Sequence, residues 1–340
     1  MTRSTLRTGL ALAALAAGTM AAQAQETLRF QSSDPSGNPN FELQQQWAAS
    51  VSEKTDGALT VELLPVDSIV AYNETQDAIA SGILDGHVTD TSYFAGKDPA
   101  FGLIANPVGA WSDPEEMFTF METGGGAELM NELLNPYGLQ FIGATTPGLE
   151  AFVSDVPIEG VDDLAGVKVR APEGLVQQVF AAAGAAPVNL PGSEVFTSLD
   201  KGVIDAADYS VFSTNQAQGL HDVARHPVYP GFHSMPLVEI SMNKAKWDAL
   251  PQEQKDALTE SVREFSRNQV AALKEKDEAA VAEVASNPDV TVHDWPAEER
   301  AKFRAIAVDE WQTVAAKSEN AQKVYDALTG YLTENGMMSQ

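Results

Sequence analysis

The hydrophobic pattern after the first two dozen residues alternates between the periods of strands and helices. Residues 27–32 and 59–64 alternate apolar and polar side chains, which predicts two strands with one buried face each. Between them, residues 41–55 carry Leu43, Trp47 and Val51 at a spacing of four, which predicts an amphipathic helix. The chain therefore opens with a strand–helix–strand unit.

The same alternation continues as far as residue 209 and predicts two successive α/β units. In the first unit we expect helices at 73–80, 114–122 and 127–134 and strands at 86–91 and 139–144. In the second we expect strands at 151–154, 167–170, 186–190 and 204–209 and helices at 175–183 and 194–200. Such alternation favours mostly parallel sheets with helices on both faces.

The last hundred residues predict a different organisation, dominated by helices. Residues 237–242 read as a strand that returns towards the first unit. Residues 252–285 contain almost no helix breaker, and one apolar stripe runs along them. A single helix of roughly 34 residues would be about 50 Å long, which is longer than one unit is wide. The segment therefore either braces both units or is split into two helices. Residues 297–332 are again predicted to be helical.

The N-terminal segment has the pattern of a secretory signal peptide. Arg3 and Arg7 precede an apolar run at 10–17, and Ala22-Gln23-Ala24 fits a cleavage site near Ala24. The chain has no Cys, which excludes disulfides, thiolate chemistry and lipid attachment at the cleavage point. No later apolar stretch approaches the ~20 residues that span a bilayer. We therefore predict a soluble protein exported to the periplasm.

Charge and length narrow the function further. The 340 residues include 48 acidic and 21 basic ones, for a net charge of −27. At about 150 residues per domain the length suggests two domains. The negative charge argues against a partner that is a nucleic acid or an anionic membrane surface, since both would be repelled.

Common catalytic motifs are missing from the sequence. It contains no nucleophile elbow, zinc-protease helix, phosphate-binding P-loop or dinucleotide fingerprint. The glycines at 124–126 lack a following Lys and lie between two predicted helices, so we interpret them as a turn. The five His residues are scattered, and their spacing predicts no metal site. We therefore do not predict an enzyme.

One basic residue stands out at the end of a predicted strand. In the strand at 167–170, a period of two puts Val167 and Val169 on the buried face and Lys168 and Arg170 on the other. Ligands of open α/β sheets bind at the carboxyl ends of strands, and the planar fork of an Arg matches a carboxylate. From spacing alone, Arg170 fits equally well as a ligand-binding residue or as half of a structural ion pair.

Five segments in order resemble the solute-binding proteins of tripartite ATP-independent periplasmic (TRAP) transporters. They are YFAGKDPAF (93–101), VDDLAGVKVR (161–170), EVFTSLDKGVIDA (194–206), YPGFH (229–233) and NKAKWDALP (243–251). The resemblance covers most of the chain after the signal peptide. It implies a two-lobed α/β fold of the type II-like periplasmic binding proteins, with hinge strands and a long helix bracing both lobes.

The resemblance also implies a division of the chain. After the signal peptide at 1–24, lobe I comprises 25–146 with returning segments at roughly 237–290. Lobe II comprises 147–236, and 291–340 form C-terminal helices that pack on the lobes.

The binding site follows from the same resemblance. Family members hold the ligand carboxylate with an Arg at the position of Arg170, and the residue at the position of Tyr93 points into the cleft. An acid–aromatic pair at the site is matched by Asp208 and Tyr209. The branch with the most similar motifs binds 2-oxo and 2-hydroxy monocarboxylates. Two aromatic residues near these motifs, Phe152 and Phe232, are candidates for apolar walls or for core packing.

Some members of that branch hold the ligand through a metal ion, but this sequence departs from their ligand set. Gly148 and Ser234 fall where metal ligands are expected. Asp208 with backbone oxygens is a poor site for Ca²⁺, which takes six to eight oxygens, although Glu150 is a possible substitute. We therefore predict no metal and no cofactor. Asp208 would then accept hydrogen bonds from the ligand or pair with Arg170.

Together these features predict an extracytoplasmic receptor for a small organic anion, delivered to the membrane permease subunits of a TRAP transporter. The aromatic candidates favour a monocarboxylate with a hydrophobic or aromatic body. Two alternatives remain at this point: a binding protein for an ABC importer, and a periplasmic α/β enzyme acting on an organic acid.

Overall fold

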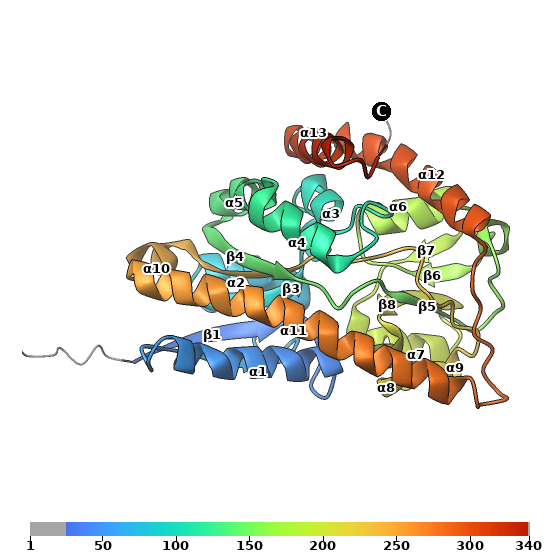
Figure 1. Cartoon of the computed structure of the whole chain (residues 1–340), viewed down its shortest axis with the longest axis horizontal. Helices are drawn as coiled ribbons and strands as arrows, with labels where there is room; N and C mark the ends of the chain where they lie inside the picture. Colours follow the sequence, from blue (N-terminus) through green and yellow to red (C-terminus); the bar gives the residue numbers. More distant parts are fainter. Residues whose placement is uncertain (1–24, 339–340) are drawn as a thin grey trace, which may run out of the picture.

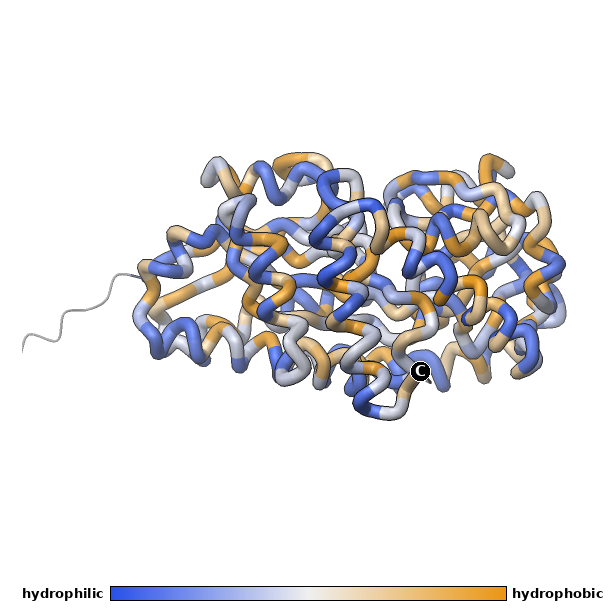
Figure 2. The backbone as a smooth tube through the Cα atoms, turned by 90° about the horizontal axis from the view of Figure 1, so that it is seen from above, coloured by the Kyte–Doolittle hydropathy of each residue, from blue (hydrophilic) through white to orange (hydrophobic). Residues whose placement is uncertain are grey.

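A computed structural model describes residues 25–338, so the predicted signal peptide lies outside the described residues. Two β-sheets lie one after the other along the longest axis of the molecule, each covered by helices (Figure 1). Seen from above, apolar and polar positions alternate along the outer helices, as elements that pack one face on a sheet require (Figure 2). The two-lobed α/β fold predicted from the sequence is confirmed.

The first sheet has five strands in the order β2-β1-β3-β9-β4. Its strands are β1 (Glu26–Ser32), β2 (Leu59–Leu64), β3 (Gly86–Asp90), β4 (Leu139–Thr145) and β9 (Val238–Asn243). The helices of this part are α1 (Pro39–Lys54), α2 (Thr75–Ala80), α3 (Pro99–Ala105), α4 (Pro114–Thr123), α5 (Gly126–Leu134) and α10 (Lys244–Ala249). Strand β9 is thus supplied by a segment that returns about a hundred residues after β4.

The second sheet has four strands in the order β5-β8-β6-β7. Its strands are β5 (Ala151–Ser154), β6 (Lys168–Arg170), β7 (Ala186–Val188) and β8 (Ala206–Ser210). Its helices are α6 (Leu175–Ala182), α7 (Val195–Asp200), α8 (Phe212–Ala217) and α9 (Leu220–Val223).

The expectation of mostly parallel sheets needs one correction in each sheet. β1 runs parallel to β2 and β3, but β9 is antiparallel to both β3 and β4. β6 runs parallel to β7 and β8, but β5 is antiparallel to β8. The two reversed strands are those that the chain enters directly after crossing between the sheets. Such a crossing delivers the strand from the opposite end, so its direction is reversed.

The long helix is a single element, α11 (Gln252–Val284), and it runs across both parts of the molecule (Figure 1). It packs on α1 and β4 of the first part and on α8 of the second. The residues predicted to be helical at 297–332 form two helices, α12 (Ala297–Ala315) and α13 (Glu319–Glu334). The break occurs at Ser318, whose side chain accepts the backbone N–H of Ala321 as a helix cap.

Two chain segments cross between the sheets side by side, at 146–150 and 224–237. The N–H of Glu150 donates to the carbonyl of Ser234 at 2.8 Å, and Phe152 pairs with Val228 as an isolated antiparallel bridge. The residue boundaries of the two lobes stay a prediction. No helix within residues 25–338 combines the length and apolar character needed to cross a membrane.

Candidate functional site

The carboxyl ends of strands from both sheets meet the crossing segments in one buried region. Asp90 ends β3 and Tyr93 lies in the short 3₁₀ turn that follows, whereas Arg170 ends β6 and Asp208 lies in β8. Glu150 comes from the first crossing segment. The fold thus brings together four of the predicted site residues: Tyr93, Glu150, Arg170 and Asp208. They are buried and close enough to shift one another's pKa.

Arg170 is buried, with 3% of its surface exposed, and its guanidinium is held in place by backbone carbonyls. Its Nε donates to Leu190 O at 3.1 Å and its Nη1 to Asp208 O at 2.6 Å. Because β6 and β8 are paired in register at Arg170 and Ala207, Asp208 follows directly beside it. The neighbouring cation on the same strand face, Lys168, instead pairs with Asp205 at the surface.

Tyr93 is a further neighbour of the guanidinium, and each of the two groups shifts the pKa of the other. Burial lowers the pKa of Arg170, but Tyr93 and the carboxylates of Asp208 and Glu150 outweigh this and raise it above its ordinary value. Of the five N–H donors that a guanidinium offers, two are used by the carbonyls. The backbone carbonyls thus leave part of the guanidinium unused.

A second group of buried polar side chains lies beside Arg170. One potential ligand atom from each of Glu150, Asp208 and His233 lies within 4.8 Å of the other two. These residues are 4%, 2% and 1% exposed. Asp208 Oδ2 and both ring nitrogens of His233 have no hydrogen-bond partner among residues 25–338.

Sequence reasoning missed His233, which we had grouped with the scattered histidines. Its signal was its place at the end of the YPGFH segment, one residue before Ser234. The second crossing segment positions it, because this segment runs antiparallel to the one that carries Glu150. Glu150 and His233 are neighbours in space although 83 residues separate them in the sequence. A local sequence pattern does not reveal such a contact.

Acidic groups dominate the electrostatics of the region. Burial, and then the charge of Asp208, raise the pKa of Glu150 well above its ordinary value. Burial also raises the pKa of Asp34 and of Asp90 to about 6 each. His233 has a lowered pKa, because burial outweighs the attraction of Asp208. The site therefore holds several acids around one Arg, and the imidazole of His233 is neutral near pH 7.

Tyr209 lies at the contact between the two parts of the molecule. Its hydroxyl accepts a hydrogen bond from Asn38 Nδ2 at 3.2 Å, and Asn40 Nδ2 donates to Ser210 Oγ at 3.3 Å. Asn38 also caps α1, where its Oδ1 accepts the N–H of Asn40. These bonds join the start of α1 to the end of β8. The sequence indicated Tyr209 but not Asn38 or Asn40.

The two aromatic candidates lie in the core that encloses the region. Phe152 stacks on Phe180 with ring centroids 5.4 Å apart, and Phe232 stacks on Trp295 at 3.8 Å. Both rings also pack against the imidazole of His233. Their visible contacts are therefore core packing around His233. The ring that faces Tyr93 belongs to Tyr72, edge-on at 4.7 Å.

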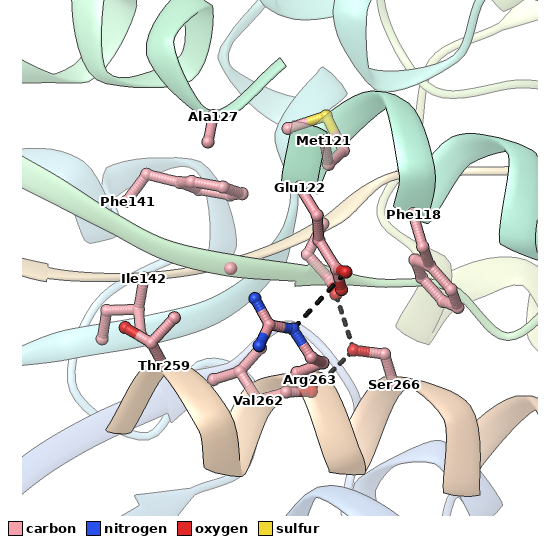
Figure 3. Close-up of a pocket in the computed structure, with 12 residues that line it drawn as sticks. Phe118, Met121, Glu122, Ala127, Phe141, Ile142, Thr259, Val262, Arg263 and Ser266 are labelled. Atoms are coloured by element: carbon pink, nitrogen blue, oxygen red, sulfur yellow. Dashed lines mark hydrogen bonds and ion pairs between the residues drawn. The ribbon is translucent and has the colours of Figure 1, made fainter. Parts of the chain in front are cut away.

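A separate pocket of about 130 Å³ lies between α4, α5, β4 and α11 (Figure 3). Arg263 from α11 and Glu122 from α4 face each other across it, with Nε and Oε2 3.4 Å apart. None of its lining residues belongs to the region around Arg170. Its charged groups are paired with each other, so it does not compete with that region as a site.

Known proteins resemble the chain over nearly its whole described length. A crystal structure of a TRAP periplasmic solute-binding protein from Rhodobacter sphaeroides, in an apo open form, is 65% identical, covers 93% of this chain and all of that one, and has a TM-score of 0.76. A TRAP solute-binding protein from Pseudoalteromonas atlantica with bound sodium and pyruvate is 23% identical, covers 92% of this chain and 95% of that one, and has a TM-score of 0.83.

A curated relative from Nostoc sp. is named a monocarboxylate 2-oxoacid-binding periplasmic protein. It is 28% identical over 209 residues, which are 61% of this chain and 57% of that protein, less than two thirds of its length. The family model for bacterial extracellular solute-binding proteins, family 7, matches residues 30–318. The resemblance to TRAP solute-binding proteins is thereby confirmed, and the chain belongs to bacterial extracellular solute-binding protein family 7.

Proposed function

We propose that this protein is a periplasmic receptor that binds a small organic acid anion between its lobes and delivers it to the membrane subunits of a TRAP transporter. Arg170 binds the ligand carboxylate, assisted by the hydroxyl of Tyr93. Family membership supports the general role, because the relatives described above are solute-binding proteins. The names of two of them specify 2-oxoacids and pyruvate, which supports a monocarboxylate ligand.

The observation that carries the proposal is the environment of Arg170. Burying a guanidinium costs several kcal/mol unless partners compensate for the lost water. Here two of its donors are fixed on carbonyls, which orients the fork, while the nearest carboxylates belong to a crowded acid group. A ligand carboxylate would accept hydrogen bonds from the guanidinium donors that the carbonyls do not use, in a medium where the attraction is stronger than in water.

Binding would stabilise a closed arrangement of the lobes only through a difference in affinity between the open and closed forms. The bonds from Asn38 and Asn40 to the end of β8 already join the two parts. Tyr72 and Tyr209 flank the same region, and their rings would contact an apolar or aromatic body of the ligand. This favours a monocarboxylate of that kind over a sugar acid.

The test is a thermal-shift screen of organic acids followed by titration calorimetry of the best ligands. We expect Arg170→Ala to abolish binding and Arg170→Lys to weaken it strongly, because an ammonium lacks the fork. Lys168→Ala is the matched control, since it removes a cation from the same strand without touching the site. Unchanged affinity in the Arg170→Ala protein, with its fold retained by circular dichroism, would refute the role of Arg170.

Two further measurements address the alternatives. Incubating the best ligand with the protein and following it by NMR should reveal no chemical change, whereas turnover would support a periplasmic enzyme. Uptake in vesicles that contain the permease should be driven by an ion gradient. A requirement for ATP would support an ABC importer instead.

A further inference from the structure

We infer that His226 and His293 form a binding site for a divalent transition-metal cation of the zinc class, at the outer edge of the second sheet. The inference is independent of the proposed function, because it requires neither a ligand in the cleft nor a role for Arg170. It also revises the prediction, drawn from spacing along the sequence, that the histidines form no metal site.

The two histidines lie in segments that the backbone holds side by side. His226 belongs to the second crossing segment and His293 to the connection between α11 and α12. The N–H of His293 donates to Pro227 O at 2.8 Å, and the N–H of Tyr229 donates to His293 O at 2.8 Å. The N–H of His226 donates to Ser154 O at 2.7 Å. Backbone hydrogen bonds therefore fix the positions from which both rings extend.

This pair lies apart from the region around Arg170. Figure 1 shows the connection between α11 and α12 at the outer edge of the second sheet, on the side away from the first sheet. In the second crossing segment His226 lies seven residues before His233. Both His226 and His293 are partly exposed. An ion can therefore reach them from solvent without passing through the cleft.

The first support is the distance between two ring nitrogens. His226 Nδ1 and His293 Nε2 lie 3.0 Å apart, and the ring centroids are 5.3 Å apart. Zinc bonds to imidazole nitrogens are about 2.0–2.1 Å long, so two nitrogens on one tetrahedral ion lie about 3.4 Å apart. The observed separation differs from this by a few tenths of an ångström. A small rotation of either side chain would therefore let a cation replace the hydrogen between the rings.

The second support is the group on the other side of His293. A histidine that binds a metal usually donates its second ring N–H to a carboxylate or a carbonyl. His293 Nδ1 lies 3.5 Å from Glu159 Oε1, and the side chain of Glu159 is 75% exposed, so it is free to turn towards the ring. A carboxylate at Nδ1 favours the tautomer with its hydrogen there. Nε2, which faces His226, then keeps the lone pair that a metal ion needs.

The third support is the chemistry of the surroundings. Burial and the neighbouring ring of His226 lower the pKa of His293, which favours the neutral ring that can coordinate a metal. Glu159 and Asp163 supply negative charge beside the same ring, which attracts a cation. Neutral imidazoles suit zinc, copper or nickel, whereas calcium and magnesium favour oxygen ligands. The remaining coordination positions of the ion would be filled by water.

The test uses purified protein stripped with a chelator and titrated by calorimetry with zinc alone, and separately with calcium. No organic acid is present, so the outcome does not depend on the proposed function. We expect saturable zinc binding, at least tenfold weaker binding of calcium, and a melting temperature that rises with zinc concentration, because the ion binds the folded arrangement. Absence of zinc binding, or a preference for calcium, would overturn the inference.

Variants assign the site. His226→Gln and His293→Gln should each weaken zinc binding at least tenfold. Glu159→Gln should weaken it less, because Glu159 acts only through the second nitrogen of His293. His221→Gln is the matched control, since His221 lies in α9 of the same part of the molecule but packs against Phe212. Zinc binding that persists unchanged when both His226 and His293 are replaced contradicts the assignment.

X-ray absorption at the zinc edge identifies the ligands without any substitution, so it decides the matter even if a variant fails to fold. With one equivalent of zinc on the wild-type protein, scattering from two imidazoles is expected. Scattering from a single imidazole, as binding at His233 would give, or from a shell of oxygens alone would overturn the inference.

Discussion

Two buried pairs of a histidine and a carboxylate, in different parts of the molecule, differ in the distance between their partners. In the first sheet, His87 Nε2 lies 2.7 Å from Glu239 Oε1, and the ring is fixed from the other side by Thr75, 2.9 Å from Nδ1. Glu239 also accepts a hydrogen bond from Thr91 at 3.1 Å. Between the lobes, His233 and Asp208 are 3.9 Å apart and share no bond.

The two pairs therefore contribute differently to the stability of the fold. A buried pair in contact contributes to folding, because removing one partner leaves the other uncompensated. A buried pair whose partners lie too far apart for a hydrogen bond contributes less to folding, and its lone pairs are not used by the partner. Burial alone therefore does not distinguish these two histidines, whereas the distance to the neighbouring acid does.

The largest expected effect breaks the first pair. Glu239→Ala should lower the free energy of unfolding by about 3–5 kcal/mol, because His87 and Thr91 lose their buried partner. Asp208→Asn should lower it by less, because it loses the attraction to Arg170 but also removes the negative charge that raises the pKa of Glu150. Urea unfolding of the apo proteins measures both. Equal destabilisation by the two substitutions would remove the distinction between the regions.

A medium effect concerns the acids near Arg170. The folded-state pKa of Asp34 and of Asp90 is raised to about 6, above the unfolded value of 3.8. The folded protein therefore holds these protons more tightly, so stability is gained as pH falls through 6 towards 4 and lost as pH rises. We expect the apo protein to melt several degrees higher at pH 5 than at pH 7.5.

Substitutions separate this effect from the general repulsion of a chain with net charge −27. Asp90→Asn removes one titrating group but keeps an oxygen that can cap the turn at Ser92. It should raise stability at pH 7.5 by on the order of 1–3 kcal/mol and flatten the pH dependence. An exposed substitution of equal charge, Glu62→Gln, should leave the slope intact. An unchanged slope in Asp90→Asn would show that the cleft acids do not set it.

The sequence predicted the scaffold better than the site. Period-two and period-four patterns located almost every strand and long helix, because each element buries one face locally. They missed α3, whose signals were the cap Asp98 and Pro99 at its first turn rather than a periodic stripe. The patterns also did not predict that β9 and β5 run antiparallel to their neighbours. The direction of a strand depends on where the chain crosses between the sheets and not on the local pattern of side chains.

The site divides along the same line. Its position at a strand end made Arg170 a candidate, and the resemblance of its segment to the family favoured a ligand-binding role, which stays a prediction. Asp208 and Tyr93 became candidates because they lie in segments that resemble the family. His233, Asn38 and Asp90 became candidates only because two sheets and two crossing segments meet in this region. Contacts of this kind join residues far apart in the chain, so no single window of sequence contains them.

The smallest expected effect sharpens the comparison at the contact between the lobes. Tyr209→Phe removes the hydroxyl that accepts from Asn38 Nδ2, while the ring stays. A net hydrogen bond contributes about 0.5–1.5 kcal/mol, so ligand affinity should fall roughly two- to twelvefold. Because the bond joins the two parts and not the interior of one, the melting temperature of the apo protein should change little. Small-angle scattering of the apo variant should detect a more open average shape.

Tyr331→Phe, whose ring packs against Trp111 and Phe120 far from the cleft, is the control and should leave affinity unchanged. A loss of apo stability in Tyr209→Phe without loss of affinity would place this bond with His87 and Glu239, among the contacts that serve folding and not binding.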